Sequence, residues 1–186
     1  HEAELNRRVY LVFQPAEETA EGARFMLKTG ILDSVKRIYG VHIFNGIPSG
    51  KISLEAGPRM AATNWLAVHL YGKSGHAGKP HEGIDTAVAV SSMVMNMQTI
   101  VSRNLNPLDP AVLTIGKIEA GTARNVIAGE DKIEGTARTF SKQAQEMIEE
   151  RVKDIAKAHE QMYGIDVTVD FQPSSHGALI NDPEIV

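Results

Sequence analysis

Two segments in which apolar and other residues alternate constrain the fold most strongly. They enclose two predicted helices and two further predicted strands. "LAVHLYGK" (66–73) and "IDVTVDF" (165–171) turn apolar and other side chains to opposite faces in strict alternation, as half-exposed strands do. Between them the sequence predicts a helix over 84–103, strands over 111–120 and 131–140, and a helix from the cap Ser141 to Gly164. The order from 66 to 172 is therefore β, α, β, β, α, β, the ferredoxin-like arrangement of a four-stranded sheet with two helices on one face. The apolar stripe of the first helix is expected at Val88, Val94, Met95 and Val101.

The earlier part of the chain predicts a portion of an α/β layer. "RVYLVF" (8–13) and "RIYGVHIF" (37–44) are apolar, β-forming runs of the kind that lie buried on both faces of a sheet. The stretch "ETAEGARFMLKTG" between them has apolar residues at helical spacing and Gly30 as a C-terminal cap, and "KISLEA" (51–56) predicts a further short strand. We expect a mixed α/β protein in which 61–172 is a domain inserted into another one.

Composition narrows the classes of function. A net charge of −4 gives no broad attraction for nucleic acid or an anionic membrane. No apolar stretch approaches the ~20 residues of a membrane helix, and no signal peptide is evident. The absence of cysteine removes thiolate nucleophiles and cysteine-ligated zinc from this chain. We therefore expect a cytoplasmic protein without nucleic-acid or membrane partners.

Two adjacent acids in "QPAEE" (14–18) follow the first predicted strand. In a loop at a strand end both carboxylates can converge on a cavity, where one binds a metal ion and the other takes a proton from metal-bound water. Glu17 and Glu18 fit that pair, and they also fit a solvated pair at a helix start, where acids favour the dipole. His42, inside the apolar "GVHIF", fits either a metal ligand or a core histidine bonded to the backbone.

Polar residues in three later segments suit substrate binding. The loop "SGHAGKPHEG" (74–83) carries His76 and His81 between a strand and a helix. Asn125 has an amide that can donate to a developing oxyanion, and Arg138 has a guanidinium that can hold a carboxylate. The same residues also fit a polar turn, a turn-stabilising asparagine and a surface strand arginine, and without further context the last two interpretations are favoured for Asn125 and Arg138. His159, on a charged helix, is given no role.

Together these segments resemble a known family. "VFQPAEE", "EGARFMLKTG", "GVHIF", "SGHAGKPH" and "RNVIAGE" resemble the metal-dependent amidohydrolases that include aminoacylase, hippurate hydrolase and the auxin amino-acid conjugate hydrolases. Carboxypeptidases and succinyl-diaminopimelate desuccinylases are more distant relatives. The similarity covers nearly the whole chain. It implies part of a zinc-peptidase-like α/β catalytic domain, formed by 1–60 and 173–186, and an inserted dimerisation or lid domain over 61–172.

The resemblance also implies catalytic roles. The first glutamate of the family's pair is the general base and the second binds metal, which corresponds to Glu17 and Glu18. His42 matches a further metal ligand. His76 corresponds to the histidine that reaches the neighbouring subunit's active site and stabilises the oxyanion. Two divalent ions, zinc or manganese, are the implied cofactors.

Substrate binding is implied for two residues of the inserted domain. Asn125 matches the asparagine of the family's "NVIP" stretch, in which Ala128 stands where proline is usual, and Arg138 matches a position that contacts the substrate carboxylate in relatives. His81 fits the family pattern without an assigned role. The family's other metal ligands, a cysteine and a histidine upstream and a histidine near the C-terminus, have no counterparts here. We therefore expect an internal fragment of the enzyme.

The resemblance implies that the parent enzyme is a homodimer that cleaves the amide bond of N-acyl amino acids or peptide-like conjugates. Two metal ions would activate water, and Glu17 would take its proton and pass it to the leaving amine. With Glu18 and His42 as its only ligands, the fragment is expected to bind metal weakly and to be inactive.

A second class of function stays open from the element order alone. The same β, α, β, β, α, β order serves non-enzymatic dimerising or small-molecule-binding modules. RNA binding is disfavoured, because the charge is negative and no aromatic-rich strand is present.

Overall fold

The computed structural model describes residues 7–19 and 21–186, and the chain divides into two compact units, residues 1–53 and 54–186. The described part of the first unit contains the 3₁₀ turn Glu17–Thr19 and the helix α1 (Glu21–Lys28). Gly30 follows this helix at φ +73°, and its N–H donates to the carbonyl of Leu27 over 3.2 Å. The predicted helix and its glycine cap are confirmed.

The strands predicted over 8–13, 37–44 and 51–56 are wrong. These residues lie in neither strand nor helix, and their apolar side chains are exposed: Leu11 by 81%, Val41 by 99% and Ile52 by 83%. A strand needs a neighbour that pairs with its N–H and C=O groups, and no described segment of the chain pairs with these three. The apolar pattern indicates which segments can enter a sheet, but a strand forms only beside a partner.

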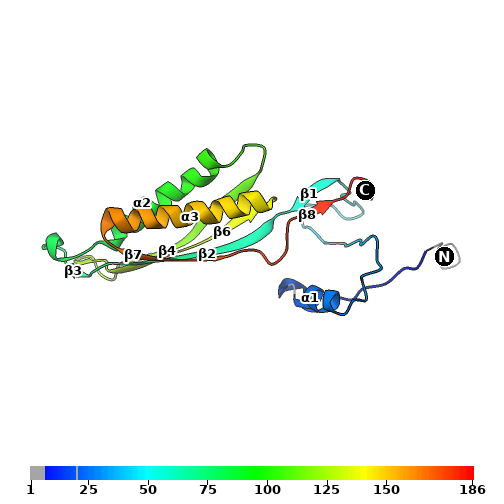
Figure 1. The fold of residues 1–186 in the computed structure, drawn as a ribbon, viewed down its shortest axis with the longest axis horizontal. Coiled ribbons are helices and arrows are strands. Elements are labelled where there is room, and N and C mark those ends of the chain that lie inside the picture. The colour runs from blue at the N-terminus through cyan, green and yellow to red at the C-terminus, as the bar shows by residue number, and fades with distance from the viewer. Residues whose placement is uncertain (1–6, 20) are drawn as a thin grey trace. The chain divides into compact units, whose positions relative to one another are not determined.

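The second unit is built on a four-stranded antiparallel sheet in the order β4-β6-β2-β7. Its strands are β2 (Ala62–Tyr71), β4 (Ala111–Ala120), β6 (Glu130–Thr139) and β7 (Asp166–Gln172). Figure 1 shows α2 (Thr86–Thr99) and α3 (Lys142–Tyr163) on one face of this sheet, which leaves the other face open. Along the chain the elements follow the predicted order β, α, β, β, α, β.

Two short ribbons lie at opposite ends of this sheet (Figure 1). At one end β1 (Gly57–Met60) pairs with β8 (Leu179–Asn181), close to the start of β2. At the other end β3 (Gly75–His76) pairs with β5 (Val126–Ile127), beyond the end of β2. These are called the β1–β8 end and the β3–β5 end. The chain enters the second unit at the β1–β8 end.

The hydrophobic core lies between the sheet and its two helices. In β2 the alternation is as predicted: Leu66, Val68 and Leu70 are buried, while Trp65 and Tyr71 lie on the open face and are exposed. The other strands and both helices complete the core with Ala89, Val90, Met93, Met97, Ile100, Leu113, Ile133, Ala137, Ile148, Val152, Ile155, Ile165 and Phe171.

The predicted apolar stripe of α2 is wrong for two of its members. Val88 and Met95 are 55% and 70% exposed, whereas Val94 and Val101 pack partly buried at the margin of the core. The segment is apolar on nearly every side, so hydrophobicity alone does not select a face. The helix also ends in a π turn over Ile100–Asn104, which changes the phase of the residues that follow.

The helix α3 begins and ends as the sequence predicts. The Ser141 side chain accepts a hydrogen bond from the Ala144 N–H over 3.0 Å, and Gly164 follows the last turn at φ +67°. His159, which the sequence placed on a charged surface, is only 2% exposed. Its Nδ1–H donates to the Ile155 carbonyl over 2.7 Å, and its Nε2 accepts from the Ser92 hydroxyl on α2 over 3.3 Å. None of the described helices has the length and apolarity needed to cross a bilayer.

Replacing Ile133 by Ala should lower the free energy of unfolding by about 2–5 kcal/mol, because this central-strand side chain is fully buried. Ile118→Ala is the matched control on the edge strand β4, where the side chain is 49% exposed and the loss should stay below about 1 kcal/mol. Urea unfolding measures both values. Equal losses would contradict the burial of Ile133 at the centre of the core.

Candidate functional site

The paired acids lie in a turn that packs directly on α1. Glu17 and Glu18 are both exposed in the 3₁₀ turn, and Ala16 before them has φ +48°, a left-handed conformation that costs about 1–2 kcal/mol outside glycine. Gly22 is the buried residue of α1, and a Cβ atom built on it would lie 1.6 Å from the carbonyl oxygen of Pro15. The loop and the first turn of the helix therefore touch through backbone atoms, which fixes the acids relative to α1.

His42 is not the buried strand histidine that the sequence predicted, since its segment forms no strand and its side chain is exposed. Its Nδ1 lies 2.8 Å from the carbonyl oxygen of Ile43, and its ring stacks on Phe44 with centroids 4.5 Å apart. A carbonyl oxygen can only accept, so Nδ1 carries the proton and Nε2 keeps its lone pair. Histidine ligands of metals usually have this arrangement, with one nitrogen donating to a backbone carbonyl.

Two side chains of the first unit are of types that can bind a metal ion. The carboxylate of Glu18 and the Nε2 atom of His42 are ligands that both zinc and manganese accept. Within the described residues, no three side chains of Asp, Glu, His or Cys gather closely enough to hold an ion. A catalytic zinc site usually has about three protein ligands. The described residues therefore include suitable types of ligand, but too few of them to complete such a site.

The structure brings His76 and Asn125 together. His76 ends β3 and lies opposite Val126 of β5, and the Ala77 N–H donates to the carbonyl of Asn125 over 3.1 Å. Both side chains are exposed. Ala128 is buried, and its carbonyl accepts the N–H of Thr86 over 3.0 Å, so this connection is tied to the start of α2.

Arg138 lies far from that pair. It is exposed near the β1–β8 end of β6, opposite Thr63, whereas β6 begins with Glu130 at the β3–β5 end. Eight residues of antiparallel strand separate Arg138 from Glu130, a span of about 27 Å. Within one subunit, Arg138 therefore cannot contact a small molecule held by His76 and Asn125.

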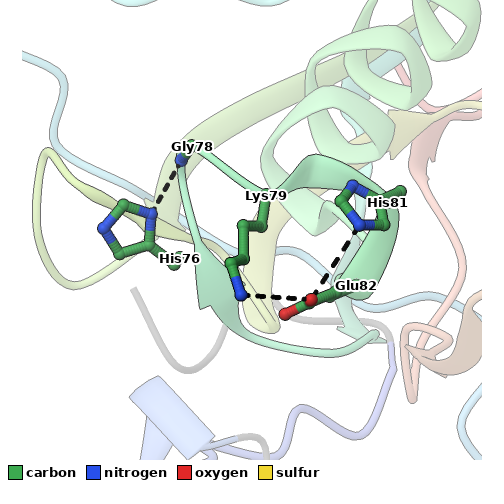
Figure 2. Close-up of polar contacts among 5 residues, drawn as sticks. All are labelled: His76, Gly78, Lys79, His81 and Glu82. Carbon is green, nitrogen blue, oxygen red and sulfur yellow. Dashed lines mark hydrogen bonds and ion pairs between the residues drawn. The ribbon is translucent and has the colours of Figure 1, made fainter.

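His81 lies on the same loop as His76 without contacting it. Figure 2 shows Lys79 and His81 directed at the carboxylate of Glu82, with Lys79 Nζ at 3.4 Å and His81 Nε2 at 3.9 Å from Oε1. The imidazole of His76 points to the other side of the loop, toward the backbone of Gly78. The structure supplies no role for His81 beyond this exposed charge cluster.

A hollow of about 600 Å³ on the open face of the sheet contains none of the predicted site residues. It is lined by Trp65, Gly116, Gly135 and charged side chains that already bond to one another. The hydrogen bonds that Lys117 donates to Glu119 and, with smaller effect, to Glu134 raise the pKa of Lys117, and a hydrogen bond donated by Lys132 lowers the pKa of Glu134. Both groups stay charged near neutral pH, and this hollow adds nothing to the candidate site.

Known proteins with these features are metal-binding peptidases and deacetylases. The model of "Peptidase family M20/M25/M40" matches residues 1–186. An N-acetyldiaminopimelate deacetylase of Exiguobacterium sibiricum is 38% identical over 180 residues, which cover 96% of this chain and 48% of that protein. An N-acetylcysteine deacetylase of Bacillus subtilis is 40% identical over 162 residues, 87% of this chain and 43% of the relative.

A solved structure is similar over the same range. The crystal structure of a dinuclear metal-binding peptidase of the M20 family from Bacillus subtilis matches with a TM-score of 0.69 and 32% identity, over 92% of this chain and 42% of that one. The chain therefore shares the mixed α/β fold of this solved structure over most of its length. The chain belongs to peptidase family M20/M25/M40. It spans about half the length of the curated relatives that it matches.

Replacing Gly22 by Ala should displace the loop that carries the paired acids. Alanine gains about 1 kcal/mol of helix propensity over glycine. Its Cβ would lie 1.6 Å from Pro15 O, however. That overlap outweighs the gain, because Pro15 O is a backbone atom that cannot move aside as a flexible side chain can. The amide NMR signals of Glu17 and Glu18 should shift. Gly46→Ala, with no atom within 4 Å of the new Cβ, is the control, and identical spectra for the two variants would contradict the packing described here.

Proposed function

We propose that this chain is part of a dinuclear-metal amidohydrolase that cleaves the amide bond of N-acyl amino acids or peptide-like conjugates. The observation that carries the proposal is the pair Glu17 and Glu18 in a chain whose every residue falls within the match to peptidase family M20/M25/M40. Relatives with an N-acetylated amino acid in their names support the substrate class.

The metal-binding residues would be Glu18 and His42, together with ligands from the rest of the longer protein. Two bound divalent ions, zinc or manganese, would supply a water made acidic enough to lose a proton at neutral pH. Glu17 takes that proton and returns it to the amine that leaves. Because Glu17 and Glu18 are adjacent, the carboxylate of Glu18 can bind a metal ion while that of Glu17 remains free to accept the proton.

Residues of the second unit would bind the substrate. His76 donates a hydrogen bond to the acyl oxygen as negative charge develops on it, and the amide of Asn125 assists from the connection beside it. Arg138 holds the substrate carboxylate through its guanidinium. Hydrogen bonds that strengthen as charge develops lower the barrier, whereas the contact to the carboxylate mainly orients the substrate.

The separation of Arg138 from His76 implies that the two act in different active sites. Arg138 lies about 27 Å along β6 from Glu130, and His76 lies beyond that end of the sheet, so the two are farther apart than a small N-acyl amino acid reaches. The chain enters the second unit at the β1–β8 end, the end of the sheet at which Arg138 lies. We assign Arg138 to its own subunit's active site and His76 with Asn125 to the partner's.

A homodimer through the edge strand β4 would satisfy this assignment. Among the described residues β4 pairs only with β6, so its outer edge has no partner there. Val112 and Ile118 of β4 and Val88 and Met95 of the helix α2 are exposed apolar side chains. Two β4 strands paired antiparallel would bring the β3–β5 end of one subunit beside the β1–β8 end of its partner, because β4 runs from one end to the other.

The same proposal assigns the domains. Residues 61–172 would be the ferredoxin-like dimerisation or lid domain, and 1–60 with 173–186 would be part of the catalytic domain. The pairing of β1 with β8 supports joining the segments on both sides of the inserted domain. A cytoplasmic location stays a prediction from the composition.

Three neighbouring acids test the proposal in a longer protein that contains this chain and its flanking segments. Glu17→Gln should lower kcat for N-acyl amino acids by about 100-fold or more while metal binding is retained. Glu18→Gln should weaken metal binding itself, because it removes a ligand. Glu21→Gln, in the first turn of α1, is the matched control and should change neither.

Hydrolysis assays and metal titrations separate these outcomes, and the 186-residue chain by itself should show little turnover. If Glu17→Gln and Glu18→Gln behave like Glu21→Gln, the paired acids are solvated helix-start residues. The alternative of a non-enzymatic dimerising or small-molecule-binding module would then take the place of the enzyme.

A further inference from the structure

We propose that Gly78 is a positioning residue for His76, whose imidazole it fixes as the tautomer that donates through Nε2. The inference rests on the proposed role of His76 as the donor to the acyl oxygen. It adds the reason why this histidine donates from one particular nitrogen, and it assigns the task to a residue without a side chain.

The tautomer follows from a single backbone contact. The N–H of Gly78 lies against Nδ1 of His76, with 2.9 Å between the two nitrogens. An amide N–H can only donate, so Nδ1 must be the nitrogen that carries a lone pair. The proton of the neutral ring is then on Nε2. A hydrogen bond at one ring nitrogen sets the function of the other in this way.

The backbone around His76 is fixed on both sides. The N–H of Lys79 donates to the carbonyl of His76 over 2.8 Å, which closes a turn with Gly78 in its third position. The side chain of His76 caps the same turn by accepting from the residue two positions later, as aspartate and asparagine side chains often do. Pairing of His76 with Val126 and of Ala77 with Asn125 joins the turn to β5.

The ring lies so close to Gly78 that any side chain there would displace it. A Cβ atom built there would be 3.1 Å from Nδ1 and 3.2 Å from Cε1 of His76. The φ angle of Gly78 is outside the left-handed region, so the backbone conformation would admit alanine. The constraint is therefore the space that the imidazole occupies, and a methyl group would push the ring by a few tenths of an ångström.

The consequence is a donor that needs no positive charge. Figure 2 shows the second ring nitrogen of His76 on the side away from Gly78 and Lys79. An Nε2–H group in this position can donate to an oxygen that gains negative charge while the ring stays neutral. Because Nδ1 accepts the hydrogen bond from Gly78, Nε2 is the ring nitrogen that can donate.

The first test uses the 186-residue chain labelled with ¹⁵N and does not depend on activity. A scalar coupling across the hydrogen bond, between the Gly78 amide nitrogen and Nδ1 of His76, should be present, and long-range spectra should show the Nε2–H tautomer. His159 is the internal control, because its Nδ1 donates to Ile155 and its tautomer should be the opposite one. Absence of the coupling in the wild-type chain would overturn the proposal.

The second test compares amide replacements of His76 in the longer, active protein. The amide nitrogen of glutamine reaches the position of Nε2, whereas that of asparagine reaches only the position of Nδ1. His76→Asn should lower kcat by about 100-fold or more, and His76→Gln should retain at least about tenfold more activity than His76→Asn. Equal activities, or a more active asparagine variant, would contradict donation from Nε2.

The third test moves the ring without changing it. Gly78→Ala should abolish the coupling and lower kcat on the order of tenfold with KM little changed, because a displaced donor weakens charge stabilisation more than binding. Gly177→Ala, with no atom within 4 Å of its new Cβ, is the control. Full activity in Gly78→Ala would remove its positioning role.

The tests also separate this inference from the proposed function. If every His76 variant is fully active while the coupling and tautomer are as predicted, the role of His76 in catalysis is wrong, and with it the inference. If His76 variants are inactive but the coupling is absent, His76 acts in catalysis and Gly78 does not position it.

Discussion

The ten-residue ladder between β2 and β6 is the constraint on which the rest of the second unit depends. The two strands pair without interruption from Ala62 and Thr139 to Tyr71 and Glu130. This register presents alternate side chains of both strands to α2 and α3 and so builds the core. It also sets the length of the sheet, which keeps the connections at its two ends apart. In the proposed enzyme, that length is what divides one active site between two subunits.

Much of this fold could be predicted because its signals are local. Alternation marked β2 and β7 correctly, and Ser141 with Gly164 marked both ends of α3 through cap chemistry that involves only neighbouring residues. The segments 8–13 and 37–44 carry equally clear apolar patterns but form no strands here. A strand forms there only beside a partner strand, which no described segment supplies, and no local pattern contains that information.

The candidate site divides in the same way. The residue types of Glu17, Glu18 and His76 suggested their chemistry, and the resemblance assigned their roles. The proximity of His76 to Asn125 could not be predicted. The strands β3 and β5 have two residues each, which is too short to produce a recognisable alternation of apolar residues. Gly22 and Gly78 act through close backbone approach, which only the folded geometry reveals. A glycine inside a predicted helix, as at Gly22, was the one available signal.

We propose that each active site combines Glu17 of one subunit with His76 of its partner, an arrangement that can be tested by mixing subunits. Inactive dimers of the longer protein carrying Glu17→Gln are exchanged with inactive dimers carrying His76→Ala, and hydrolysis of an N-acyl amino acid is measured. In a mixed dimer, one of the two sites would receive an intact Glu17 and an intact His76, so activity should return. If mixing restores no activity although mixed dimers form, both residues act within one subunit and the account is wrong.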